Sequence, residues 1–490
     1  MQILRKRKAL LGIATGVTMA LAMPGFPFAP LVFVALIPLL FASDEGGGFL
    51  PSYLAGVAFF LIDLRWLFTL ARFNMLVVPG ALLLCLYLGL YFGLFGMIVS
   101  SIRKRWTTDR SLLIIVPVLF TLFEILRNIG PLALGFSSLY QALYRFPMLI
   151  QLAAYLGPWS ITAVIAFVNV ALYLAVRRRR LRYVALAVGT VAVLFLISLL
   201  PVADDGESLK VAIVSSQVSQ AEKLDDRNLF TLLDRYTSLG QKAEAGNPDL
   251  IVFPESILPG YTLRDDRLLS RFTTLAKQAD AEILVGTGDY NHGKIYNSIA
   301  SISSRGDVVG TYDMVHLVPF GEVIPGRSIL ERIGLKSFID SFLPREVTPG
   351  DSHTPIAGVG TPICFESTFP APSRAFARNG ASLLAVITND AWFPGSSELP
   401  AHFACAVFRA VETRRYLVQA ANGGISGVID PRGQILMSQE GEGIVSGGVM
   451  LLTSQSFYTR YGDLPLYLLF AAAVLIAGGM EVRKSTKGRG

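Results

Sequence analysis

The chain has 490 residues, of which 52% are hydrophobic and 16% are charged, and its mean hydropathy is +0.52. A soluble protein of several domains does not reach such values, so the composition indicates a polytopic membrane protein. The formal net charge of +7 gathers in short basic runs that abut apolar segments. This placement argues against nucleic-acid binding and makes the charge a signal of membrane topology.

Eight apolar runs are candidates for membrane spans, since a hydrocarbon core of ~30 Å needs roughly 20 apolar residues per helix. They cover residues 9–23, 29–42, 49–70, 76–101, 111–126, 158–176, 183–200 and 464–480. Pro24, Pro27 and Pro30 interrupt the first two runs, which therefore form either two spans or one re-entrant hairpin. We expect about seven spans within residues 1–203 and one more, followed by a cytoplasmic tail, within residues 461–490.

Basic residues predict the orientation of these spans. Four clusters of Lys and Arg lie within residues 5–8, 103–110, 177–182 and 483–489. With eight spans all four clusters fall on one side, and an excess of basic residues marks the cytoplasmic side. Residues 204–460, which read as water-soluble, are then expected outside the cytoplasm.

Residues 204–460 alternate between strand-like and helix-like runs. The strand-like runs are residues 209–214, 250–253, 281–286, 361–364 and 383–387, and helical patterns cover residues 228–245 and 264–278. This alternation predicts an α/β domain with a largely buried sheet. Residues 204–207 are a plausible linker at its start.

Three positions at strand ends carry the candidate chemistry. Glu255 follows an apolar strand-like run, where a carboxylate is either a solvated cap or a buried group of raised pKa. Cys364 ends another such run, and a thiol needs a nearby base to become a nucleophile at neutral pH. Glu322 closes a loop rich in Pro, Gly and His and could be a second buried carboxylate.

The chain has three cysteines, Cys85, Cys364 and Cys405. Their spacing suggests neither a disulfide framework nor a metal site of paired cysteines. Cys85 lies in a predicted span. Cys405 lies in an apolar stretch typical of a buried helix, where an inert thiol is expected. A disulfide between Cys364 and Cys405 stays open as an alternative.

Five sequence blocks together resemble the apolipoprotein N-acyltransferase family, in which a nitrilase-type (carbon-nitrogen hydrolase) domain is fused to a membrane domain. They are residues 253–255 (Phe-Pro-Glu), 316–322 (His-Leu-Val-Pro-Phe-Gly-Glu), 363–366 (Ile-Cys-Phe-Glu), 388–393 (Thr-Asn-Asp-Ala-Trp-Phe) and 422–426 (Asn-Gly-Gly-Ile-Ser). The resemblance covers nearly the whole chain. Within the superfamily, the block ending at Glu322 is specific to the acyltransferases.

The resemblance implies an αββα sandwich at residues 204–460 and a Glu-Lys-Cys triad. Glu255 would take the thiol proton, and Cys364 would carry the acyl group as a thioester. Glu322, Glu366, Phe365 and Asn389 would support the site.

In the membrane part, Glu124 and Arg127 resemble a polar pair of the family. Charged residues inside a span indicate function by default, and a structural ion pair is the alternative.

One departure concerns the triad. The family's catalytic Lys stands two positions before the block that starts at His316, and this chain has Met314 there. Met donates no hydrogen bond, whereas the family's ammonium stabilises an oxyanion. An engineered inactivating change and natural divergence both account for it. Lys294 and His316 are nearby candidates for a compensating cation. If position 314 is the missing oxyanion donor, restoring Lys there is expected to raise acyl transfer by orders of magnitude.

Smaller departures favour divergence. Phe365 replaces an expected Tyr, and residues 215–218 lack the expected Pro and downstream Trp.

The implied reaction moves an acyl chain from a phospholipid, phosphatidylethanolamine in the first instance, to a lipoprotein's diacylglyceryl-cysteine. It needs no metal or cofactor. The expected protein is a monomer in the bacterial inner membrane, with its catalytic domain on the periplasmic side. Two alternatives remain: a membrane-tethered nitrilase-type amidase, and a catalytically silent homologue that binds lipid or lipoprotein.

Overall fold

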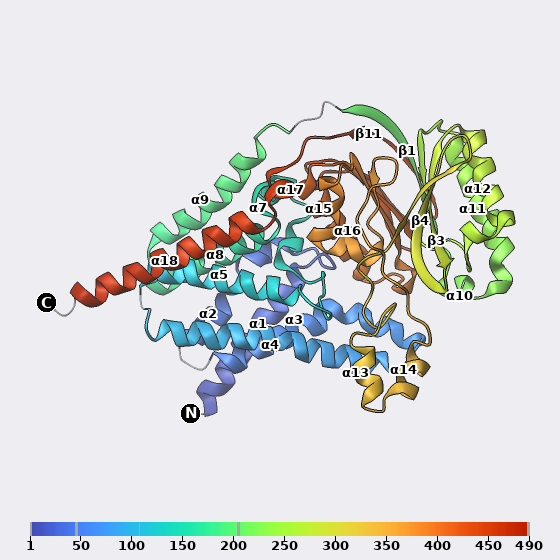
Figure 1. Cartoon of the computed structure of the whole chain (residues 1–490). Helices are drawn as coiled ribbons and strands as arrows, with labels where there is room; N and C mark the ends of the chain where they lie inside the picture. The colour runs from blue at the N-terminus through green and yellow to red at the C-terminus, as the bar shows by residue number, and fades with distance from the viewer. Residues whose placement is uncertain (1, 45–47, 107, 203–205, 488–490) are drawn as a thin grey trace.

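The computed structural model describes residues 2–44, 48–106, 108–202 and 206–487. It places a bundle of apolar helices beside a two-sheet sandwich, with both chain ends on the bundle side (Figure 1). The predicted boundary between residues 203 and 204 lies outside the described residues, as does most of the linker at 204–207. Arg489 of the last basic cluster lies outside them too.

Each of the eight predicted apolar runs coincides with a helical segment. The principal helices are α1 (Gln2–Ala22), α2 (Ile37–Asp44), α3 (Phe49–Asp63), α4 (Val77–Arg103), α5 (Asp109–Arg127), α8 (Trp159–Arg178), α9 (Leu181–Ser198) and α18 (Leu464–Lys487). In the described part of the chain, five helical segments are long and apolar enough to cross a membrane: 49–72, 77–103, 159–178, 181–198 and 464–482. The others carry charges at their ends, as α1 and α5 do, or are short, as α2 is.

Two sheets form the sandwich. The strands are β1 (Glu207–Ser215), β2 (Leu250–Val252), β3 (Glu282–Asn291), β4 (Lys294–Ile302), β5 (Val308–Asp313), β6 (Val359–Gly360), β7 (Leu383–Asn389), β8 (Leu417–Asn422), β9 (Ile425–Ile429), β10 (Ile435–Glu440) and β11 (Gly443–Leu451). The six-stranded sheet has the order β11-β1-β2-β3-β4-β5, and the five-stranded sheet has the order β10-β9-β8-β7-β6.

Helices cover the outer face of each sheet. α11 (Leu229–Glu244) and α12 (Asp266–Ala279) lie on the six-stranded sheet, and α15 (Pro370–Arg378) and α16 (Glu398–Thr413) lie on the other side (Figure 1). Side chains of β1 alternate accordingly: Ala212 packs toward α11 and α12, whereas Val211 and Ile213 pack into the core between the sheets. The predicted αββα class is confirmed.

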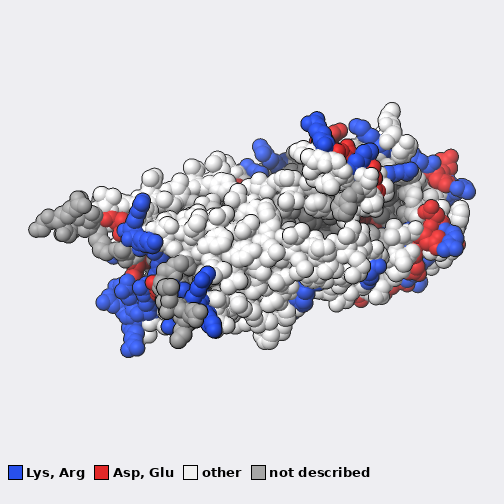
Figure 2. Space-filling view, turned by 90° about the horizontal axis from the view of Figure 1, so that it is seen from below, with Lys and Arg blue, Asp and Glu red and all other residues white. Residues whose placement is uncertain are grey.

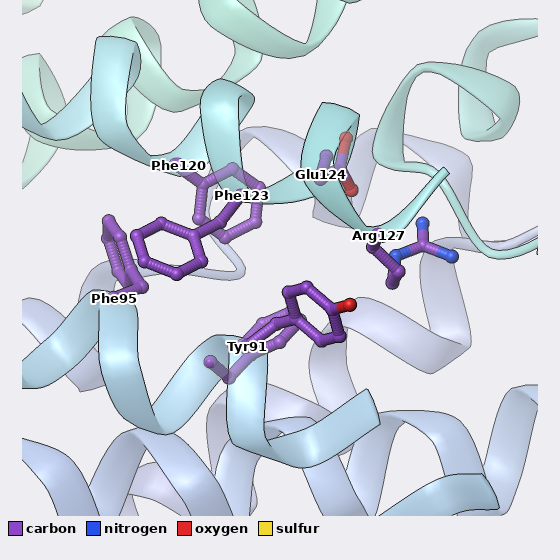
Figure 3. A pocket seen from close by; sticks show the side chains of 7 residues that line it. Tyr91, Phe95, Phe120, Phe123, Glu124 and Arg127 are labelled. Atoms are coloured by element: carbon purple, nitrogen blue, oxygen red, sulfur yellow. The ribbon is translucent and has the colours of Figure 1, made fainter. Parts of the chain in front are cut away.

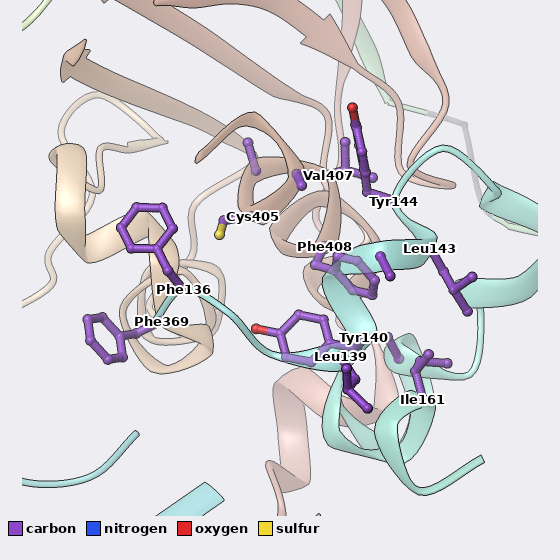
Figure 4. Packing of buried hydrophobic residues seen from close by; sticks show 14 of the residues in the cluster. Phe136, Leu139, Tyr140, Leu143, Tyr144, Ile161, Phe369, Cys405, Val407 and Phe408 are labelled. Atoms are coloured by element: carbon purple, nitrogen blue, oxygen red, sulfur yellow. The ribbon is translucent and has the colours of Figure 1, made fainter. Parts of the chain in front are cut away.

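α16 joins the sandwich to the helical bundle. Its residue Phe408 packs edge to face on Tyr140, with ring centroids 4.7 Å apart (Figure 4). Tyr140 in turn packs on Trp159 of α8. Because these residues are buried, one apolar core runs from the five-stranded sheet into the bundle. The five-stranded sheet, called the inner sheet below because its core continues into the bundle, therefore holds its residues rigidly against the apolar helices.

One predicted strand is largely wrong. Residues 361–364 were expected to be extended up to Cys364, but β6 covers only Val359–Gly360, and Ile363 makes an isolated bridge to Ile387. Pro362 has no N–H to donate to a ladder, and Cys364 has a φ of +45°, which ends the extended run.

Candidate active site

Glu255 lies in the turn that follows β2. The turn is pressed against Gly286 of β3: a Cβ there would come within 2.4 Å of the Pro254 oxygen and 2.6 Å of the Glu255 Cα. Ser256 has a φ of +44°, which directs the chain back toward β3, where the Ile257 N–H donates to the Gly286 oxygen. A glycine at position 286 is therefore needed for the placement of Glu255.

We expect Gly286→Ala to lower the rate of Cys364 acylation by about 10²-fold, because it displaces the Glu255 backbone by roughly an ångström. Gly448→Ala is the matched control, since Gly448 lies in β11 of the same sheet with open space around it. The measurement is the single-turnover rate at which a tagged phospholipid labels Cys364 in each variant. The thermal unfolding of both variants is measured alongside. Equal rates for the two variants would contradict this placement.

Asn297 of β4 connects the two carboxylates of the site. Its Nδ2 donates to Glu255 Oε1 at 2.7 Å and to Glu322 Oε1 at 3.0 Å. Burial raises the pKa of Glu255, against the attractions of Asn297, Lys223 and Cys364. Glu255 Oε2 is buried and has no hydrogen-bond partner within the described residues, so it is free to accept a proton.

Met314 occupies the centre of this group. It is 1% exposed, and its Sδ lies 3.6 Å from Asn297 Nδ2. Its main-chain N–H donates to the main-chain oxygen of Asn297. A thioether brings no charge to this position. Burial, and then repulsion by Glu255, raises the pKa of Glu322 to about 7.

The two carboxylates repel each other, so ionised Glu322 opposes ionisation of Glu255. A base must be ionised to act, so with Glu255 as the expected base the rate of Cys364 acylation is expected to rise with pH through the pKa of Glu255. We expect Glu322→Gln to move this acidic limb to lower pH. The amplitude should fall, because the amide offers one oxygen where the carboxylate accepts from both Asn297 and the Val318 N–H.

The check is a pH–rate profile of acyl-enzyme formation, with Glu440→Gln on exposed β10 as the control. A limb that stays in place or moves to higher pH would refute the coupling.

Cys364 begins the short helical turn Cys364–Thr368 in a left-handed conformation, with a φ of +45°. Such backbone conformations in non-glycine residues are costly and cluster at functional sites. The thiol is free and partly exposed. Burial in its surroundings, and then the charge of Glu255, raises the pKa of this thiol well above its ordinary value. It is therefore a thiol at neutral pH and needs a base.

Glu366 holds the segments around this thiol together. Its carboxylate accepts hydrogen bonds from the Tyr312 hydroxyl and from the N–H groups of Val315, His316 and Ile363, all at 2.8–2.9 Å. Burial nevertheless raises its pKa to about 7. Phe365 packs against both Phe369 and the His316 ring, which also pack on each other.

A buried charged cluster lies behind Cys364 and was missed by the sequence analysis. His402 of α16 contacts the Cys364 carbonyl oxygen at 3.0 Å through Nε2 and Asp390 Oδ1 at 3.0 Å through Nδ1. Although burial alone would lower it, Asp390 raises the pKa of His402 to about 9. The protonated ring donates to both partners and fixes the Cys364 backbone. Glu398 is the third member of this cluster. The atoms of Asp390, Glu398 and His402 that could bind a metal ion lie within 4.8 Å of one another. The expected absence of a metal stays a prediction.

The lysine beside the site is neither of the two basic residues that the sequence suggested. Lys223 ends the short helix α10 (Gln220–Lys223), is 6% exposed, and donates from Nζ to the Glu255 main-chain oxygen at 3.0 Å. Lys294 is exposed at the start of β4. Burial lowers the pKa of His316, which keeps its ring neutral.

Comparisons with known proteins cover nearly the whole chain. Residues 210–457 match the family model described as carbon-nitrogen hydrolase, and residues 15–171 match the apolipoprotein N-acyltransferase N-terminal domain. A protein of Geobacter metallireducens named apolipoprotein N-acyltransferase is 34% identical over 98% of this chain and 96% of its own length. The chain belongs to the apolipoprotein N-acyltransferase family. The resemblance stated from the five sequence blocks is thereby confirmed.

Other similar proteins lie further away. A relative of the same name from Thermotoga maritima is 30% identical over 95% of this chain and 92% of its own length. Among solved structures, Nit3 of Saccharomyces cerevisiae, a nitrilase-superfamily member, is 20% identical. The structural match covers 54% of this chain and 98% of the Nit3 chain, with a TM-score of 0.39.

The polar pair of the membrane part lies in α5, beside a pocket that is otherwise aromatic (Figure 3). Arg127 donates to the main-chain oxygens of Leu134, Phe136 and Ser137, and Glu124 accepts from the Leu139 N–H. Both side chains thus fix the loop after α5.

That loop reaches the site. Phe136 contacts the rings of Phe365 and His402, and a Cβ on Gly135 would come within 2.1 Å of Thr368 Oγ1. Asn389, at the end of β7, does not join the carboxylates: its Nδ2 donates to Gln220 and its Oδ1 accepts from Asn422.

Proposed function

We propose that this protein transfers an acyl chain from a membrane phospholipid to the α-amino group of a lipoprotein's N-terminal diacylglyceryl-cysteine. One observation carries the proposal: a thiol and a buried, partnerless carboxylate oxygen meet in a chain of the apolipoprotein N-acyltransferase family. Glu255 and Cys364 are its base and nucleophile.

In the first half-reaction Glu255 Oε2 takes the thiol proton while the sulfur attacks the ester carbonyl of the phospholipid. The carbonyl oxygen becomes an oxyanion and then reforms its double bond as the ester C–O bond breaks. The lysophospholipid oxygen leaves with the proton held by Glu255, and the acyl group remains on Cys364 as a thioester. Covalent catalysis of this kind replaces one difficult step by two easier ones.

In the second half-reaction the lipoprotein amine attacks the thioester carbon and gives a proton to Glu255. The C–S bond breaks, the new amide forms, and the thiolate recovers the proton from Glu255. A carboxyl of raised pKa suits both directions of this proton transfer.

Apolar surroundings suit lipid substrates. The inner sheet shares its core with the bundle. Exposed apolar side chains lie on the Glu322 loop, as Phe320 does, and on the segment that follows it, as Ile329 and Ile333 do. We propose phosphatidylethanolamine as the first donor to test, a monomeric enzyme, and no cofactor.

The charge distribution supports an inner-membrane location with the sandwich outside the cytoplasm. Lys and Arg gather at the end of the bundle away from the sandwich, and a broad uncharged zone separates the two ends (Figure 2). A basic rim on one side of such a zone marks the cytoplasmic face.

The experiment uses the full chain in liposomes that contain phosphatidylethanolamine with an alkyne-tagged acyl chain. We expect the tag first on Cys364 and then, once a diacylglyceryl lipopeptide is added, on the peptide amine. Loss of the tag to water without transfer would favour the tethered amidase, and absence of any tag on the protein would favour the silent homologue.

A further inference from the structure

Lys223 is brought to the site by hydrogen bonds that could not be predicted from the sequence. After β1, Ser216 Oγ and the Val218 N–H both donate to Asn422 Oδ1, at 2.9 and 2.8 Å. Gln220 accepts from Asn389 at 3.0 Å. These bonds tie the segment before α10 to the inner sheet, so that Lys223 turns toward the Glu255 loop.

The surroundings of Lys223 are unusual for a lysine. It is 6% exposed, and within the described residues the structure gives its ammonium one hydrogen bond, to the main-chain oxygen of Glu255. No carboxylate there lies within 4.0 Å of it, and burying an ammonium without a charged partner is energetically costly. Such groups cluster at functional sites.

The ammonium is 3.0 Å from the Glu255 main-chain oxygen and interacts electrostatically with both reacting groups. Burial lowers the pKa of Lys223 to about 8, while Glu255 and Cys364 act in the opposite direction. An ammonium has three N–H donors. With one of them on Glu255, two remain for a substrate oxygen.

We propose that Lys223 is a catalytic residue of this enzyme: its ammonium donates to the oxyanion formed when Cys364 attacks the acyl carbonyl. It thus supplies the charge that Met314 does not bring. The inference rests on the proposed function and adds a residue to it.

The step balances without a further reactant. The thiol proton passes to Glu255, the sulfur–carbon bond forms, and the carbonyl π electrons move to oxygen, where Lys223 stabilises the negative charge. When the oxyanion collapses, the leaving oxygen takes the proton from Glu255. Lys223 keeps its own protons throughout. Removing one oxyanion donor commonly lowers the rate by ~10²–10³.

The test is the single-turnover rate of Cys364 labelling by tagged phosphatidylethanolamine in liposomes. Lys223→Met is expected to label ~10²–10³ times more slowly than the unchanged chain. Lys294→Met, on exposed β4, is the control and is expected to label within about twofold of it. Labelling of Lys223→Met at nearly the unchanged rate would overturn the inference and leave the proposed function intact. A lack of labelling in the unchanged chain would overturn both.

If Lys223→Met fails to fold, the pH dependence of the labelling rate provides a second test. Because the ammonium must be charged to act, the labelling rate of the unchanged chain should fall as pH rises through about 8. Lys223→Arg keeps its charge above this pH and is expected to move the basic limb upward, at reduced amplitude. A basic limb that is identical in the two proteins would reject the assignment.

Discussion

Replacing Cys364 by alanine is expected to abolish labelling by tagged phospholipid and to lower acyl transfer by ~10⁴–10⁶-fold. Alanine has no group that can form a thioester, so both half-reactions lose their intermediate. The residual rate then comes only from bound substrates that are held together. Cys364→Ser is expected to fail as well, because a hydroxyl is a far weaker acid than a thiol and Glu255 cannot deprotonate it effectively.

Cys405 provides the matched control for this experiment. It is fully buried in α16, donates to the Ala401 oxygen, and accepts from Gln141. Burial raises the pKa of its thiol to about 12, which makes it inert. Cys405→Ser should keep labelling near the unchanged level. Mass spectrometry of the tagged peptide identifies the modified residue, and a tag on Cys405 would refute the assignment of the nucleophile.

The sequence predicts the part of the site that stands at the ends of apolar runs. Glu255 follows the run at β2, and Cys364 ends the apolar run at residues 361–364, although only part of that run is extended in the structure. Both are recognisable because a polar group directly after a buried strand needs a reason to be there. The exact backbone at Cys364 could not be predicted, since its positive φ depends on contacts from Glu366 and His402.

Asn297 and Lys223 give no such signal. Asn297 lies in the middle of β4, and it meets Glu255 only because β4 pairs with β3, which in turn pairs with β2. Lys223 follows a capping box of Ser219 and Glu222, which predicts a helix start but no site. Its burial comes from hydrogen bonds to Asn422 and Asn389 of the inner sheet, some 170–200 residues further along the chain.

In the membrane part, too, the sequence identifies the polar residues but not the contacts that they make. Glu124 and Arg127 are conspicuous in an apolar run, so the sequence singles them out. Their hydrogen bonds are made mainly to the loop after α5, and that loop carries Phe136 to the ring of Phe365. The two side chains thus act as a polar anchor in the bundle that positions a loop near Cys364, and their functional role stays a prediction.

The sequence alone predicts a large gain from Met314→Lys, but because Lys223 lies beside the site, this gain is expected only when Lys223 is absent. In the unchanged chain Lys223 already provides a donor for the oxyanion, so the single substitution should alter the labelling rate by less than about tenfold. In a Lys223→Met background it should raise the rate by ~10²–10³, because the new ammonium replaces the missing donor. Non-additivity of this kind is the mark of two residues that serve one interaction.

The local structure favours this rescue. The Met314 sulfur lies 3.6 Å from Asn297 Nδ2, whose other partners are the carboxylates of Glu255 and Glu322. An ammonium at this place would meet two carboxylates, so its burial would be compensated. It would also lower the pKa of Glu322 from about 7, which keeps this carboxyl ionised to lower pH.

The four proteins of this cycle (unchanged, each single variant and the double variant) are compared by single-turnover labelling at one pH. A strong gain from Met314→Lys in the unchanged background would mean that Lys223 leaves the oxyanion without a donor. Absence of rescue in the double variant, with thermal unfolding unchanged, would mean that position 314 does not face the oxyanion. A gain confined to the Lys223→Met background follows only if either ammonium can serve the same oxygen.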